Sequence, residues 1–216
     1  MANGGVASGL RAREPTLVIA TRSAHKLREL RQLLHLEHAD LVSLDDVGVE
    51  GDVVEDARTF EGNASKKARW AARVSGLPAL ADDSGLEVDA LGGAPGVRTR
   101  RYAGDHATDE DNNAKLLAAL DGLPPERRGA RYVCVLALAL PPDATRIVTR
   151  RGTVRGRIAG ARRGSNGFGY DPIFEPADEP PGGRTFGQWS AEEKNRISHR
   201  ARAARAMARV LQAGGF

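Results

Sequence analysis

The strongest constraint on the fold is an alternation of short apolar runs with longer segments of helical periodicity. Residues 16–21 are apolar and rich in β-branched side chains, which is typical of a buried strand. Ser23 follows, and the leucines of residues 24–36 recur at helical spacing. The chain therefore begins its regular structure with a strand, a tight loop and a helix.

The same alternation continues along the chain. Further strands are expected at 39–44, 130–140 and 145–159, and further helices are expected to begin at Thr59, Thr108 and Ser190. This order of helices and strands predicts a single α/β or α+β domain over residues 15–216. Residues 1–14 are rich in glycine, alanine and arginine without any period, so we expect a disordered extension there.

Composition excludes several classes of protein. No window approaches eighteen consecutive apolar residues, so we expect neither a membrane-spanning helix nor a membrane partner. Cys134 is the only cysteine, which excludes an internal disulfide and favours a cytoplasmic location. The formal charge of +4 does not by itself indicate nucleic-acid binding.

The loop at 21–26, between the first strand and the first helix, is the first segment that could carry chemistry. Free N–H groups at a helix N-terminus attract phosphate. Thr21 and Ser23 would add hydroxyl groups, and Lys26 would add a positive charge. The alternative is that Ser23 only caps the helix and Lys26 is solvated.

The acidic pair Asp82-Asp83, followed by Ser84, is the second such segment. A strand that rises into this pair would present carboxylates at the edge of the sheet, where ligands of α/β proteins bind. Adjacent strand residues point to opposite faces, so the two aspartates should have different roles. The alternative is an ordinary acidic turn.

Glu55 precedes a helix on which Asn63 and Lys67, four residues apart, share one face. Glu55 and Asp83 could hold a hard cation through oxygen ligands, because Mg²⁺ uses one or two carboxylates together with substrate phosphates. Taken alone, Glu55 is better interpreted as a solvated acid of the loop. With an ordinary pKa of about 4, Asp83 would be a weak base that is ionised at neutral pH.

The glycine-rich loop at 165–174 contains Phe168 and Tyr170, whose rings could stack on a flat group such as a nucleobase. Asp171 could accept a hydrogen bond from an N–H group of that base. A loop whose aromatic side chains only anchor it to the core is the alternative.

The segment at 194–200 contains Lys194, His199 and Arg200. On one regular helix these side chains would point in different directions. They converge on one ligand only if the helix breaks near Ser198, which could itself cap a second helix. The alternative is a solvated, arginine-rich face.

Taken in order, these segments resemble the noncanonical purine nucleoside triphosphate pyrophosphatases (inosine/xanthosine triphosphate pyrophosphatase, dITP diphosphatase). The resemblance runs from about Thr16 to the C-terminus. It rests on T-x-S-x-x-K at 21–26, T-F-x-x-N-A-x-x-K-A at 59–68, ADDSGLEVDALGGAPGV at 81–97, GFGYDPIF at 167–174 and EKNxISHR at 193–200. Ser23 departs from the family, which usually has asparagine at this position.

The resemblance implies an α/β fold with an elongated central mixed sheet flanked by helices, two lobes with an active-site cleft, and a homodimer. It also implies Mg²⁺-assisted hydrolysis of a nucleoside triphosphate to the monophosphate and pyrophosphate. Asp83 would be the catalytic base and, with Glu55, a metal ligand. The substrate-binding residues would be Thr21, Ser23, Lys26, Asn63, Lys67, Ser84, Phe168, Gly169, Tyr170, Asp171, Lys194, His199 and Arg200.

Within this set, Lys26, Lys67 and Lys194 would hold the triphosphate, and they are three of only five lysines in the chain. Phe168 would stack on the base, while His199 and Arg200 would read its 6-oxo edge. A 6-amino group would leave such donors unpaired, which can reject the wrong base by about 10⁴-fold.

Two other functions remain open from the sequence. One is a pyrophosphatase of similar architecture that acts on pyrimidine or modified nucleotides. The other is a nucleic-acid-binding module that uses the arginine-rich C-terminal helix. The arginines are spread around that helix and the total charge is nearly balanced, so we expect no nucleic-acid partner.

Overall fold

A six-stranded mixed sheet with the strand order β2-β1-β3-β4-β5-β6 organises the computed structural model, which describes residues 15–36 and 39–216. The strands are β1 (Thr16–Ala20), β2 (Asp40–Ser43), β3 (Ala79–Val88), β4 (Gly129–Ala139), β5 (Ile147–Ile158) and β6 (Phe174–Pro176). The helices are α1 (Ala24–Leu34), α2 (Phe60–Ser75), α3 (Asp109–Ala119), α4 (Ala191–Ile197) and α5 (His199–Ala213), and the 3₁₀ helix η2 spans Gly96–Arg101. The predicted strands and helices are confirmed, whereas the extension expected at 1–14 lies outside the described residues.

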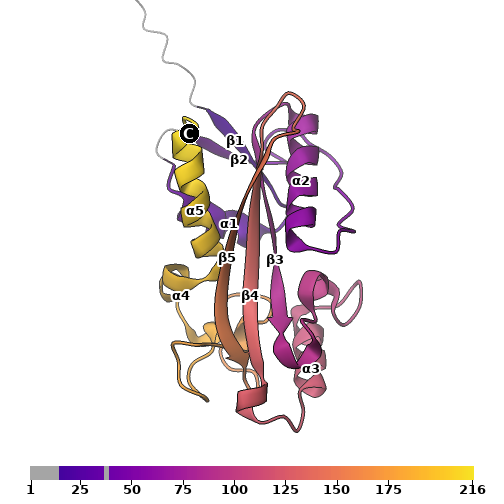
Figure 1. Ribbon diagram of the computed structural model, residues 1–216, viewed down its shortest axis with the longest axis vertical. Helices are drawn as coiled ribbons and strands as arrows, with labels where there is room; N and C mark the ends of the chain where they lie inside the picture. Colours follow the sequence, from indigo (N-terminus) through magenta and orange to yellow (C-terminus); the bar gives the residue numbers. More distant parts are fainter. Residues whose placement is uncertain (1–14, 37–38) are drawn as a thin grey trace, which may run out of the picture.

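The type of strand pairing changes once across the sheet, from parallel to antiparallel at β3. β1 runs parallel to β2 and β3, and all other neighbours are antiparallel, including the predicted hairpin of β4 and β5. These two long strands run along the long axis of the molecule (Figure 1). β1 pairs with β3 only as far as Ala20 opposite Ala81, so the next residues of β3 are free of a strand on that side.

The acidic pair lies in the middle of β3, which continues through it to Val88. The prediction of a strand end at the sheet edge was therefore wrong, and so was the alternative of an acidic turn. The pair is reachable because β1 stops beside it: Asp82 lies opposite Leu136 of β4, one position past the last pair with β1. This part of β3 is accessible because no strand pairs with it on the β1 side, although β3 itself continues.

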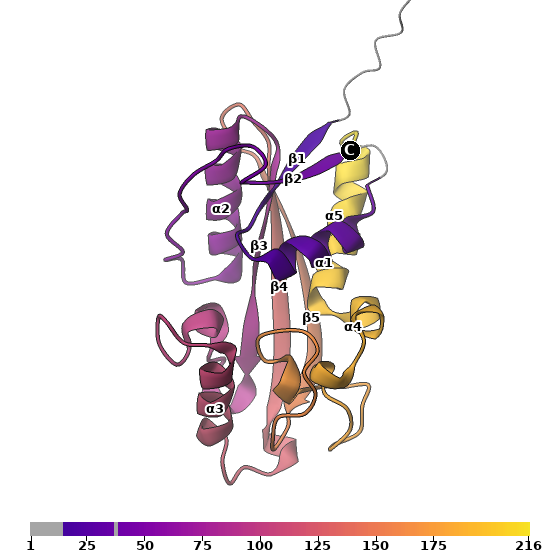
Figure 2. The same ribbon diagram turned by 180° about the vertical axis from the view of Figure 1, so that it is seen from behind.

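Alternate residues of β4 face two separate cores, as the pleat of a strand requires. Val133 and Val135 pack against the alanine stripe of α2, whereas Cys134 and Leu136 pack with α1 and α5. Figure 1 shows α2 and α5 on the two sides of the long strands, and Figure 2 shows α1 beside α5. A third core at the other end of the sheet combines residues of α3 with aromatic side chains of residues 170–189.

Local capping sets the helix boundaries that the sequence predicted. Thr59 Oγ1 accepts a hydrogen bond from the Gly62 N–H at 3.0 Å, and Gly76 ends α2 in a left-handed conformation with a φ of 69°. Thr108 and Ser190 each begin a helix with a capping box. None of the helices in the part of the chain that the structure describes is long and apolar enough to cross a membrane.

Candidate active site

A cavity of about 460 Å³ opens beside the middle of β3. It lies between the lobe that carries α1, α2 and α5 and the lobe that carries α3 and the 167–171 loop (Figure 2). All but one of the predicted site residues line it. These are Thr21, Ser23, Lys26, Glu55, Lys67, Asp83, Ser84, Phe168, Gly169, Tyr170, Asp171, Lys194, His199 and Arg200.

The loop after β1 presents the N-terminus of α1 to the cavity. Ser23 caps the helix, because its Oγ accepts from the Lys26 N–H at 3.4 Å. Thr21 Oγ1 in turn accepts from the Ser23 N–H at 3.1 Å. The first turn of α1 carries no acidic residue, so its remaining N–H groups and its partial positive charge are available to an anion. Ser23 thus caps the helix, as the alternative interpretation of this loop expected.

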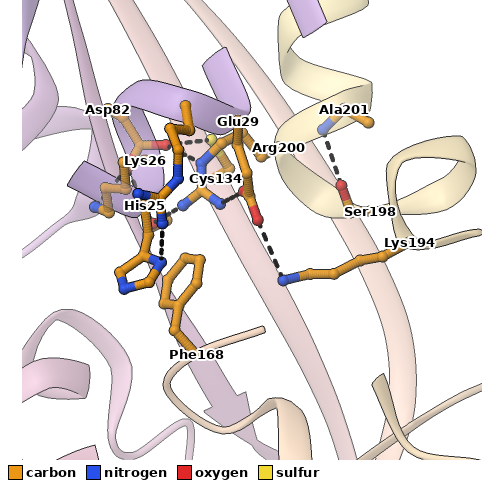
Figure 3. Close-up of polar contacts among 12 residues, drawn as sticks. His25, Lys26, Glu29, Asp82, Cys134, Phe168, Lys194, Ser198, Arg200 and Ala201 are labelled. Atoms are coloured by element: carbon orange, nitrogen blue, oxygen red, sulfur yellow. Dashed lines mark hydrogen bonds and ion pairs between the residues drawn. The ribbon is translucent and has the colours of Figure 1, made fainter. Parts of the chain in front are cut away.

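Asp82 is the centre of a buried ion-pair network. Its carboxylate lies 2.5 Å from Lys26 Nζ and 2.9 Å from Arg200 Nε, and it accepts from Ser84 Oγ at 3.0 Å and Cys134 Sγ at 3.1 Å. Burial opposes ionisation, but Arg200 and Lys26 hold the pKa of Asp82 well below its ordinary value. Figure 3 shows Lys26 of α1 and Arg200 of α5 converging on this carboxylate. Lys26 is therefore paired rather than solvated.

Asp83 points to the other face of β3 and has a different environment from Asp82, in agreement with the different roles that the alternation of a strand predicted. One carboxylate oxygen lies 3.2 Å from Lys67 Nζ, and the other is buried without a hydrogen-bond partner. Burial raises the pKa of Asp83 to about 6, with only partial compensation by the charges of Lys67 and Lys26. The prediction of an ordinary pKa for Asp83 was wrong, because the sequence does not show how deeply the carboxylate is buried.

Glu55 and Asp83 both contact Lys67, each at 3.2 Å from its ammonium nitrogen. The structure thus brings together the two carboxylates that the sequence proposed as metal ligands. The unpartnered oxygen of Asp83 and the half-exposed Glu55 form an oxygen donor set suited to a hard cation. In the described residues no group of three or more such side chains occurs, so phosphate oxygens or water would have to complete the coordination.

Asn63 is the one predicted residue that does not line the cavity. It is 2% exposed, and its side-chain oxygen accepts from the Ala57 N–H at 2.9 Å. The segment that carries Glu55 is thereby attached to α2, and the Arg101 guanidinium also donates to the Glu55 carbonyl at 3.1 Å. The position of Asn63 thus supports an acidic residue of the site instead of facing a ligand.

Phe168 forms an aromatic platform in the wall of the cavity that faces the first turn of α1. The His25 ring stacks on it at 5.3 Å between centroids, and Lys194 Nζ lies 4.9 Å from its centroid. Asp171 accepts from the Phe168 N–H at 3.0 Å, from Lys194 Nζ at 2.6 Å and from the Tyr132 hydroxyl at 3.3 Å. With these partners, Asp171 holds the loop and Lys194 rather than offering a free acceptor to a base.

Ser198 breaks the C-terminal helical segment, as the sequence suggested. It ends α4 and its Oγ caps α5 by accepting from the Ala201 N–H at 3.1 Å. α5 approaches β5 closely at Gly152, where a Cβ would lie 2.1 Å from the His199 carbonyl oxygen. The break and the close approach together place Lys194, His199 and Arg200 at one cavity. Figure 3 shows Lys194 and Arg200 on the two sides of Ser198.

His199 and Arg200 differ in charge and in partners. The His199 ring stacks on Tyr132 at 4.6 Å, and burial together with the Arg200 charge lowers the pKa of His199 well below its ordinary value. The imidazole is therefore neutral at physiological pH. Arg200 is fully buried and donates to Ser84 Oγ at 3.0 Å, to Asp82 and to Glu29.

Sequence reasoning missed Glu29, His25 and Tyr132. Glu29 bridges Arg200 and Lys194 from α1, and it lies three residues after Lys26 on the same helix. The helical spacing of three residues between Lys26 and Glu29 was the signal that could have identified Glu29. The missed aromatic contacts join segments far apart in the sequence and had no local signal.

The side chains of the site do not carry enough positive charge to neutralise a triphosphate. The ion pairs of the site form two separate networks, which together contain four cations and five carboxylates and carry a net negative charge when all are ionised. A triphosphate carries about four negative charges near neutral pH, and phosphoryl-transfer sites meet this charge with metal ions and cationic side chains. An additional cation would therefore have to accompany such a ligand.

The cavity offers N–H and cationic donors at the loop of residues 21–26, paired carboxylates beside β3 and an aromatic platform at Phe168. Phosphates, a hydrated cation and a base require these three environments. The fold and the site together define an α/β enzyme that acts on nucleotides.

The chain belongs to the Ham1 family, whose model matches residues 17–210. A dITP/XTP pyrophosphatase from Syntrophobacter fumaroxidans is 54% identical over 87% of this chain and 78% of the relative. One from Anaeromyxobacter dehalogenans is 48% identical over 91% of this chain and 97% of the relative. The solved structure of a HAM1 protein from Coxiella burnetii has a TM-score of 0.83 and 41% identity, covering 92% of this chain and 99% of that chain.

Proposed function

We propose that this protein hydrolyses noncanonical purine nucleoside triphosphates, namely dITP, XTP and ITP, to the monophosphate and pyrophosphate. Relatives named dITP/XTP pyrophosphatases, 54% and 48% identical, support the substrate class. The observation that carries the proposal is the buried, unpartnered oxygen of Asp83, which lies beside Lys67 and Glu55 in the cavity.

Glu55 and Asp83 would hold Mg²⁺, together with phosphate oxygens of the substrate. When bound, the ion would supply positive charge to the triphosphate and lower the pKa of a coordinated water. Its charge would also balance the excess of carboxylates in the site.

The chemistry requires that water attack the α-phosphorus. Asp83, with a pKa of about 6, is mostly ionised at neutral pH and is a better base than an ordinary aspartate. It would take a proton from the water as the new P–O bond forms. The bond from the α-phosphorus to its bridging oxygen breaks, and pyrophosphate leaves with the electron pair. Lys26, Lys67 and the N-terminus of α1 would stabilise the charge on the leaving group.

Base selection would use the buried donors at the α4–α5 junction. Phe168 would stack on the purine, and His199 and Arg200 would donate to its 6-oxo group. Arg200 is held by Asp82, Glu29 and Ser84, so its orientation is set before a ligand arrives. The 6-amino group of adenine is a donor and would meet these donors instead of an acceptor, so we expect adenine nucleotides to be rejected.

The resemblance to the family also supports a proposal on assembly and location. We infer a homodimer in the cytoplasm, with residues 15–216 as one catalytic domain. Analytical ultracentrifugation of the full chain tests the dimer directly, since a sedimentation coefficient of a monomer at micromolar concentration would contradict it.

A nucleotide panel tests the proposed function. Pyrophosphate release is measured from ITP, XTP, dITP, dTTP, UTP, ATP and GTP, with Mg²⁺ and with EDTA. We expect release from the first three, dependent on Mg²⁺. Preferential cleavage of dTTP or UTP would support the pyrimidine alternative, and absence of release from every nucleotide would refute the enzyme assignment.

A further inference from the structure

Helix α3 holds the loop that carries Phe168. The Gly169 N–H donates to Asp109 Oδ2 at 2.6 Å, and the Asn113 side-chain amide donates to the Gly169 carbonyl at 2.9 Å. Gly169 has a φ of 63°, a left-handed conformation that favours glycine. Both polar backbone groups of the residue next to the platform are therefore bonded to one helix.

The same helix is bonded to the neighbouring wall of the cavity. The Asn112 side chain donates to the Arg100 carbonyl at 2.9 Å and accepts from the Ala103 N–H at 2.8 Å, which joins α3 to the end of η2. The Tyr170 hydroxyl donates to the Thr99 carbonyl of η2 at 2.8 Å. Two successive residues of the loop are thus held by two elements that are bonded to each other.

Burial makes the attachment through Asn113 strong. Asn113 is 0% exposed, and its amide nitrogen donates to the Asp109 carbonyl at 2.7 Å as well as to Gly169. A buried amide is costly unless its donors are satisfied. Movement of the loop away from α3 would leave one of these donors without an acceptor.

We infer that Asp109 and Asn113 are positioning residues for the purine base. The inference rests on the proposed stacking of the base on Phe168. A platform that is already ordered reduces the entropy lost on binding and keeps its ring at a constant distance from the donors of His199 and Arg200. The pair acts on the base end of the substrate and leaves the phosphate end to the loop at 21–26.

A matched pair of variants tests this role. Asp109→Ala and Asp109→Asn both remove the charge at the start of α3, but asparagine keeps an oxygen that can accept from the Gly169 N–H. For the loss of one hydrogen bond we expect Asp109→Ala to raise the KM for ITP and the inhibition constant of IMP about five- to tenfold. The inhibition constant of pyrophosphate should stay within about twofold, because this product lacks the base.

Two further variants complete the test. Asn113→Leu should reproduce the effect of Asp109→Ala, and Asp109→Asn should remain close to the wild type. Glu110→Ala is the control on the same turn, because that exposed carboxylate is paired with Arg162 instead of the loop. Circular dichroism of each variant confirms folding.

Two results would overturn the inference. One is an equal rise in the IMP constant for Asp109→Ala and Asp109→Asn, which would assign the effect to charge. The other is a parallel rise of the IMP and pyrophosphate constants, which would indicate general disruption. Failure of the proposed function is distinct: the wild type would release no pyrophosphate, or Phe168→Ala would leave the IMP constant unchanged.

Discussion

Replacing Asp83 by asparagine should abolish turnover and, in the metal-free protein, stabilise the fold. Burial raises the pKa of this carboxyl from 3.8 to about 6, so the carboxylate, although it is the main form at neutral pH, is less stable in the folded protein than in the unfolded chain. This shift in pKa lowers the free energy of unfolding of the wild type at neutral pH by about 3 kcal/mol. We expect the variant to regain about 2 kcal/mol of it, because asparagine still buries a polar amide. In a chain of this size the melting temperature would rise by roughly 4–8 °C.

The gain in stability depends on pH in a defined sense. Between about pH 4 and about pH 6 the folded wild type keeps a proton on Asp83 that the unfolded chain has lost. The stability of the wild type therefore falls as the pH rises through this window, and the variant lacks this contribution. The advantage of the variant should be complete above about pH 6 and disappear near pH 4.

Thermal unfolding in EDTA at several pH values measures this effect, and pyrophosphate release with Mg²⁺ measures turnover. Asp82→Asn is the matched control at the adjacent position. It should destabilise the fold by about 3–5 kcal/mol, because Lys26 and the buried Arg200 lose their shared carboxylate. A lower melting temperature for Asp83→Asn at neutral pH in EDTA, an advantage that does not change with pH, or retained turnover would refute the reasoning.

Three further outcomes follow from the site. The kcat/KM for ITP should fall below about pH 6, because Asp83 must be ionised to act as a base. At higher Mg²⁺ concentrations this fall in rate should begin at a lower pH, because the metal competes with the proton for the carboxylate. A fall whose pH does not change with Mg²⁺ concentration would contradict ligation of the metal by Asp83. Lys194→Ala should raise KM, lower kcat or both, by about tenfold in kcat/KM, since it removes a cation held by Asp171; unchanged steady-state kinetics would exclude a role in binding. Asn63→Ala should raise the Mg²⁺ concentration for half-maximal rate severalfold by loosening the Glu55 segment, and an unaltered Mg²⁺ titration would count against this support.

Features that depend on neighbours in the sequence were predictable. The caps of Thr59, Thr108 and Ser190 connect residues three positions apart, so the sequence alone indicates where these helices begin. The break at Ser198 was readable for the same reason, and it brought Lys194 and Arg200 to one cavity as expected. Opposite roles for the two aspartates followed from the alternation of a strand.

Features that depend on distant neighbours were not predictable. Asn63 has the spacing of a site residue, yet its side chain caps a backbone N–H of the preceding segment. Asp171 looked like a free acceptor, yet a tyrosine, a lysine and a backbone N–H occupy its oxygens. Helical periodicity gives the direction of a side chain but does not identify its partner.

The sequence by itself determined the order of strands and helices and the helix caps, because these follow from local hydrogen bonding and side-chain periodicity. The full set of residues proposed to meet a nucleotide came from the resemblance of the motifs to a known family. The tertiary structure alone decided that Asp82 is held ionised by Arg200, 118 positions away, while Asp83 is a raised-pKa acid with a free oxygen. Desolvation and Coulomb energy depend on depth and distance in space. Two identical residues, adjacent in the chain, therefore acquire different chemistry only when the sheet and its helices have packed.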